Sequence, residues 1–251
     1  MFSPETGYAD LAAAGQALSP LDGRYRLHTQ ELTQYLSEAA LNRTRIYVEI
    51  EWMIELLRRG VIVHAPLLSD AEVDYLRALP REFNADSIAE LAHIEAETRH
   101  DVKAVEYYID NRLEEARSLF GPDTVLPQLR PLVHIFATSE DINNLAHALN
   151  IQAAIRQVWL PRARGLLARL LELAEAGADI PMLARTHGQP ATPVTIGKEL
   201  AVFVYRLSRQ ISRIEDTEYL GKMNGATGTW AAHRVALPAV PWPLLTKDFV
   251  E

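Results

Sequence analysis

Residues 185–193 hold the side chains from which an acid–base site could be built. The stretch reads RTHGQPATP, and its single histidine, His187, can gain or lose a proton near neutral pH. Pro190 and Pro193 prevent a continuous helix through the stretch. We expect a stiff loop that presents His187 just before a helix, with Thr192 as the N-cap and Pro193 at the first helical position. An ordinary exposed loop histidine is the alternative.

A second polar group stands at residues 98–101, with the sequence TRHD. Thr98 and Asp101 have the spacing of a capping box, which is a sufficient structural explanation for both residues. Neither Arg99 nor His100 is needed for that cap. Both would lie at the N-terminus of the next helix, where free backbone amides and the helix dipole attract anions.

The same capping-box spacing recurs in the TSED sequence of residues 138–141. The cap explains Thr138 and Asp141 but leaves the Ser139 hydroxyl without a task. Farther upstream, the SPLDGRY sequence of residues 19–25 predicts a turn from its Pro, Asp and Gly. An ordinary surface turn before the first helix would explain Arg24 and Tyr25 equally well.

Helices must position these groups, because apolar residues recur at three- and four-residue steps along most of the chain. The pattern predicts helices over residues 42–59, 67–79, 102–113, 142–153, 166–176 and 196–214. Strand signals are nearly absent, so the predicted fold class is all-α. Proline and glycine in residues 121–131 suggest the best domain boundary. We therefore expect a leader at 1–18, a helical domain at 19–126 and the first part of a helical bundle at 127–251.

Composition limits the classes of function. The chain has 251 residues, a formal net charge of −8 and no cysteine. The negative charge argues against a general nucleic-acid binder or a protein of anionic membrane surfaces. The absence of cysteine excludes thiolate catalysis, disulfides and cysteine-ligated zinc, and no histidine spacing suits a metal. No signal peptide and no membrane-spanning apolar run is present, so we expect a cytoplasmic chain.

Four separated segments, in order, resemble the adenylosuccinate lyase family of the fumarase/aspartase superfamily. They are DGRY at 22–25, TRHDVKA at 98–104, TSEDINN at 138–144 and RTHGQPATP at 185–193, and the GKMNGATG turn at 221–228 adds a fifth. The resemblance implies an all-α fold in which an N-terminal helical domain precedes a long-helix bundle. It also implies a lyase of purine biosynthesis, which releases fumarate from adenylosuccinate to give AMP and from the succinyl-aminoimidazole-carboxamide ribotide.

The resemblance also implies roles for single residues. His187 would be the general acid, and the Thr138 and Ser139 hydroxyls would hold a substrate carboxylate. Arg24 and Tyr25 would bind the nucleotide phosphate, a task for which a planar guanidinium is suited. At the start of the next helix, the resemblance implies substrate binding by Arg99, His100 and Asp101. It also implies that His100 is a further catalytic residue. Thr186 and Gln189 are weaker candidates.

One part of the family pattern is missing from this sequence. Family members are about twice as long, and their catalytic base is a serine on a GSS-x-MP-x-K-x-NP loop that does not occur here. Because the family builds each site from several subunits of a homotetramer, we expect homo-oligomerisation, no cofactor, and an N-terminal half that is inactive alone. The alternatives are a non-catalytic helical interaction module derived from the family, or another fumarate-releasing lyase such as argininosuccinate lyase.

Overall fold

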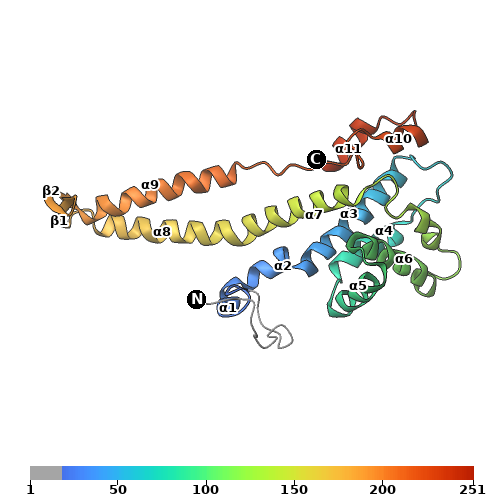
Figure 1. Cartoon of the computed structure of the whole chain (residues 1–251), viewed down its shortest axis with the longest axis horizontal. Coiled ribbons are helices and arrows are strands. Elements are labelled where there is room, and N and C mark those ends of the chain that lie inside the picture. Colours follow the sequence, from blue (N-terminus) through green and yellow to red (C-terminus); the bar gives the residue numbers. More distant parts are fainter. Residues whose placement is uncertain (1–18) are drawn as a thin grey trace, which may run out of the picture.

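The structure is a computed structural model that describes residues 19–251; the expected leader at 1–18 lies outside the described residues. Helices dominate, with one small two-stranded sheet, which confirms the all-α class (Figure 1). The elements are α1 (Arg26–Thr29), η2 (Gln30–Leu32), α2 (Thr33–Leu36), α3 (Glu38–Arg58), α4 (Asp70–Arg81), α5 (Ala85–Thr98), α6 (Asp101–Phe120), η3 (Leu126–Leu132), α7 (Ser139–Ala154), the short π-helix η4 (Ile155–Trp159), α8 (Leu160–Ala176), β1 (Pro181–Thr186), β2 (Gln189–Thr195), α9 (Ile196–Glu215), α10 (Ala231–Ala236) and α11 (Trp242–Val250).

Helix α3 is the centre of the packed part of the molecule. Its N-cap is Ser37, whose hydroxyl accepts a hydrogen bond from the Ala40 amide and so caps the first turn. One face of α3 packs with α4, α5, α6 and η3 around residues such as Ile50. The other face contacts α7, α11 and the segment before α10, where Trp52 is fully buried. Helix α3 therefore links the α4–α6 helices to the first part of the long bundle.

A long arm extends away from this packed body (Figure 1). Helices α7, η4 and α8 form one continuous helical run, the β1–β2 hairpin lies at its far end, and α9 returns antiparallel to α8. The two arm helices meet closely at Gly197, where a Cβ atom would collide with the Ala174 carbonyl oxygen. Glycine is the residue that permits this approach of two backbones.

The hairpin corrects our expectation for residues 185–193. Strands β1 and β2 pair antiparallel from Pro181↔Thr195 to Thr186↔Gln189. His187 and Gly188 form the two-residue turn, and both have positive φ angles, of 52° and 76°. Helix α9 begins after Thr195, whose hydroxyl accepts from the Lys198 amide, so Thr192 is not the N-cap. The sequence does not predict this strand pairing, because Pro190 and Pro193 of β2 argue against a strand when they are read locally.

The expected cap at residues 98–101 is also wrong. Helix α5 continues to Thr98, whose hydroxyl donates to the Ile94 carbonyl within that helix. Arg99 then takes a left-handed conformation, with φ 53°, and reverses the chain. His100 is the N-cap of α6, and its Nδ1 accepts from the Lys103 amide at 3.1 Å. His100, for which the sequence pattern suggested no structural role, is therefore the residue that caps α6.

The division into domains at residue 126 stays a prediction. Leu129 of η3 lies just past that boundary and packs in the same core as α3, α4, α5 and α6, together with Leu126 just before it. The long-helix run itself begins at Ser139.

Candidate active site

The start of α6 presents His100 and Asp101 at the surface of the packed body. Because His100 Nδ1 accepts the Lys103 amide proton, its free proton sits on Nε2, which leaves an N–H donor for an external group. In this tautomer Nδ1 cannot also form an ion pair with the Asp101 carboxylate 3.6 Å away. Burial alone would raise the pKa of Asp101, but the Val102 amide and the Arg45 guanidinium outweigh it and lower that pKa.

Arg45 of α3 joins the two helix starts that carry most of the expected site. Its side chain is 7% exposed, and its Nη2 lies 2.6 Å from Asp101 Oδ2. Its Nε donates to Asn143 Oδ1 in the first turns of α7 at 2.9 Å, and its Nη1 donates to Asn42 at 2.8 Å. A planar guanidinium can make all three bonds at once, whereas a lysine could not keep this geometry. No local sequence pattern singles out Arg45, because its partners Asn143 and Asp101 lie on other elements.

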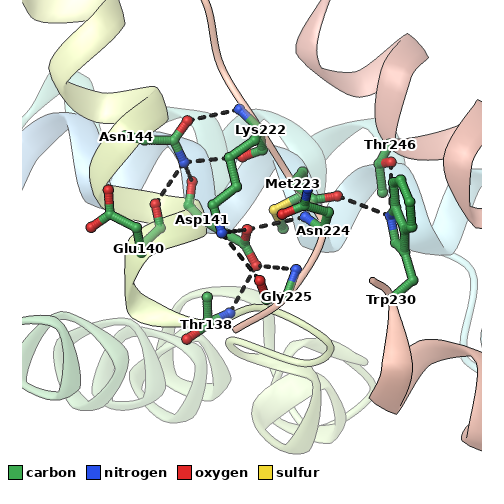
Figure 2. Close-up of polar contacts among 10 residues, drawn as sticks. All are labelled: Thr138, Glu140, Asp141, Asn144, Lys222, Met223, Asn224, Gly225, Trp230 and Thr246. Carbon is green, nitrogen blue, oxygen red and sulfur yellow. Dashed lines mark hydrogen bonds and ion pairs between the residues drawn. The ribbon is translucent and has the colours of Figure 1, made fainter. Parts of the chain in front are cut away.

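Thr138 and Ser139 stand at the start of α7, where the expected capping box is present. The Thr138 amide donates to Asp141 Oδ2 at 3.0 Å. Asp141 is fully buried and also accepts hydrogen bonds from residues 222–225, which return from the arm (Figure 2). The helix start that would hold a substrate carboxylate is thus fixed from both sides.

A buried acid–histidine pair supports the loop that leads into Thr138. His134 has a positive φ of 61°, and its Nδ1 lies 2.6 Å from Glu49 Oε1 on α3. Burial raises the pKa of the Glu49 carboxyl. Desolvation would lower the pKa of His134, but the hydrogen bond to Glu49 outweighs it and raises that pKa. One turn along α3, Trp52 Nε1 donates to the Ile135 carbonyl at 2.8 Å and holds the same loop.

The expected phosphate-binding residues lie in an exposed turn before α1. Ser19 closes this turn through bonds to Asp22 and to the Leu21 amide. Arg24 places its guanidinium 5.6 Å from the centre of the Tyr25 ring. Both side chains face solvent, so they are available to a ligand, but nothing here orders them beyond the turn itself.

His187 lies far from the other expected site residues. It is exposed at the tip of the hairpin, beyond the helical run from Ser139 to Ala176. That run is about 57 Å long at 1.5 Å per residue. Figure 1 shows the hairpin and the start of α7 at opposite ends of it. Within one copy of the chain, therefore, the expected general acid and the expected carboxylate donors do not meet.

Across residues 19–251, no cluster of three or more His, Cys, Asp or Glu side chains is arranged to hold a metal ion. The same part of the chain contains no helix that is long and apolar enough to cross a membrane.

The fold defines a class of protein, the all-helical chains in which a packed helical body carries a long antiparallel helical arm. A family model described as "Lyase" matches residues 23–242, and the chain belongs to this family, within the fumarase/aspartase superfamily.

Curated relatives agree with this assignment. The chain is 41% identical over 234 residues to adenylosuccinate lyase of Escherichia coli strain K12, and 40% identical to that of Haemophilus influenzae. Each match covers 93% of this chain and 50% of the relative, so the chain spans about half the length of the curated relatives it matches.

Solved structures share the fold. A fumarate lyase from Mesorhizobium sp. BNC1 has a TM-score of 0.67 at 19% identity, covering 88% of this chain and 47% of that one. A β-carboxy-cis,cis-muconate cycloisomerase from Acinetobacter calcoaceticus has a TM-score of 0.63 at 18% identity, with 88% and 48% covered.

Proposed function

We propose that this chain forms the N-terminal half of an adenylosuccinate lyase, a carbon–nitrogen lyase of purine biosynthesis. The reaction is a β-elimination that releases fumarate from adenylosuccinate, giving AMP, and from the succinyl-aminoimidazole-carboxamide ribotide. The supporting observation is the 41% identity to the Escherichia coli enzyme of that name across nearly the whole chain. No metal or organic cofactor is required in this proposal.

The chemistry needs a base for the proton beside a carboxylate and an acid for the departing nitrogen. His187 is the proposed acid, and it reaches the nitrogen from its exposed hairpin turn. Negative charge accumulates on the substrate carboxylate as the proton leaves, so fixed donors there stabilise the intermediate. Thr138 and Ser139, at the start of α7, are the proposed donors.

The other end of the substrate is a nucleotide phosphate. Arg24 offers a forked pair of N–H donors to phosphate oxygens, and Tyr25 lies beside it. Arg99 and His100 contribute further donors at the start of α6, where Asp101 is held by Arg45. His100 Nε2–H is the donor that the capping geometry leaves free for substrate.

The distance along the arm requires that the site be shared between copies of the chain. An arm about 57 Å long carries His187 away from Thr138 of its own copy. An arm that packs against other copies would bring His187 to a neighbour's α7 start. The exposed apolar side chains of α9, such as Phe203 and Tyr205, support this packing. We therefore propose a homo-oligomer, with a homotetramer for the full-length enzyme.

The test is complementation by the half of the relative that this chain does not match. The 251-residue chain is purified alone and also co-expressed with the C-terminal half of the Escherichia coli enzyme, and adenylosuccinate absorbance is followed in the presence of chelator. We expect no turnover by the chain alone and clear turnover by the pair. Turnover of argininosuccinate instead, or no turnover by a pair shown to associate, would contradict the proposal.

A further inference from the structure

The Asp141 carboxylate makes more hydrogen bonds than a helix cap needs. It is fully buried, and a capping box requires only its bond from the Thr138 amide. Lys222 Nζ lies 2.7 Å from its Oδ1, the Asn224 amide donates to Oδ1 at 3.1 Å, and the Gly225 amide donates to Oδ2 at 3.0 Å (Figure 2). The three additional donors all come from one segment more than eighty positions later in the chain.

A second residue of α7 fixes the register of that segment. The Asn144 side chain accepts from the Lys222 amide at 2.7 Å and donates to the Lys222 carbonyl at 3.0 Å. Both bonds are to backbone, so they depend on where Lys222 lies and not on its side chain. Trp230 Nε1 donates to the Met223 carbonyl at 3.2 Å on the opposite side (Figure 2). Residues 222–225 are thus held between α7 and the C-terminal helices.

The buried charge of Asp141 explains why a lysine is among its partners. A buried carboxylate is costly unless every lone pair finds a donor, and one positive charge must balance it. Lys222 supplies that charge and also donates to the Gly225 carbonyl at 3.2 Å, which closes the turn on itself. Gly225 has φ 80°, so the turn that aims its amide at Asp141 favours glycine.

We propose that Asp141 and Lys222 are positioning residues that lock the 222–225 segment onto the first turn of α7 and thereby set the Thr138 and Ser139 donors for the substrate carboxylate. The assignment rests on the function proposed above. Asp141 lies in the same helical turn as both donors, so any movement of Asp141 moves them as well.

The lock is tested first on the 251-residue chain without substrate, by amide hydrogen exchange. The variants are Lys222→Met, which keeps the aliphatic stem, and Asp141→Asn, which keeps the size; Glu140→Gln, at the exposed neighbouring position, is the control. Loss of a charged hydrogen bond to the buried Asp141 carboxylate should speed exchange at Thr138 and at Gly225 together, by about tenfold or more. Exchange at Gly225 that stays as slow as in Glu140→Gln would overturn the lock. If Asp141→Asn does not fold, Lys222→Met decides the question alone.

The positioning role is tested next in the complemented enzyme, through inhibition by the two products. Lys222→Met should raise the inhibition constant of fumarate about tenfold and leave that of AMP unchanged, because only the carboxylate donors are displaced. Lys222→Arg should restore part of the affinity for fumarate. A smaller folded fraction would change neither inhibition constant. Equal weakening for both products, or for neither, would overturn the assignment.

The two tests separate the lock from the proposed reaction. If the complemented wild type turns over no adenylosuccinate, the function is wrong, and coupled exchange at Thr138 and Gly225 still decides whether the lock exists. If the enzyme is active and exchange is uncoupled, the function stands and the lock is wrong.

Discussion

The packed body around α3 differs from the outer part of the arm, made of α8, the hairpin and α9, in how far its side chains are buried. In the body, even the charged side chain of Arg45 is buried, and its partners satisfy it. On the arm, Phe203 and Tyr205 are 57% and 64% exposed, and within α8 and α9 only Leu160, Ala174, Gly197 and Ile211 are buried. The body buries its polar side chains together with their partners, whereas the outer part of the arm presents His187 and an exposed apolar surface of the kind that marks interaction sites.

The largest expected effect is a loss of catalytic rate on removing His187, at the tip of the arm. His187→Ala in the complemented enzyme should lower kcat by about a hundred- to ten-thousandfold, which is the usual cost of removing a positioned acid. The urea midpoint of the 251-residue chain should not change, because His187 is exposed and touches no core. His93→Ala, an exposed histidine on the body, is the control and should leave kcat unchanged. Full activity in His187→Ala would remove this residue from the mechanism.

The next largest effect is on the free energy of unfolding, where an ion pair of the body is compared with one of the arm. Arg45→Met should lower the unfolding free energy by about 3 kcal/mol, because it leaves Asn42, Asn143 and Asp101 without their shared donor. Arg164→Met removes an exposed pair with Glu215, between α8 and α9, and should cost less than about 1 kcal/mol. Urea unfolding of both variants measures the contrast. Equal costs would mean that the body is no more tightly organised than the arm.

The apolar surface of the arm can be tested through assembly. Phe203→Glu should weaken self-association of the chain by about 2 kcal/mol for each copy that buries this ring. Sedimentation velocity over a concentration series gives the shift. Leu27→Glu, at an 84% exposed position outside the arm, is the matched control. The comparison between body and arm would fail if both variants assembled like the wild type.

The smallest effect concerns the His134–Glu49 pair in the body. Both groups have pKa values raised in the folded state, so the native chain binds extra protons. The His134 contribution is fully present below the ordinary histidine pKa, about 6.5, and is lost as the pH rises through the raised value. The Glu49 contribution follows the same course, but it begins to fall at the lower ordinary pKa of a glutamate. Between pH 6 and pH 8.5 the wild type should therefore lose more stability than His134→Gln. An identical decline in the two proteins, measured by urea unfolding, would show that the pair is not linked to folding.

The sequence alone determined the helical class, most helix positions and the family. Apolar residues at helical spacing predict α3, α4 and α6 because that pattern is local to each helix. The capping box at Thr138 and Asp141 was predicted for the same reason, since both partners lie within one turn. The structure agrees on these features because neighbouring residues decide them.

Only the tertiary structure decided which side chains act on distant segments. Arg45 and Lys222 pair with Asp101 and Asp141 because the fold brings together residues 56 and 81 positions apart. The β1–β2 pairing depends on backbone bonds between two segments, and their prolines disguise it locally. The separation of His187 from Thr138 follows from the uninterrupted length of α7, η4 and α8, which a list of motifs does not contain. Local patterns fix elements, whereas long-range burial and helix length determine which residues meet.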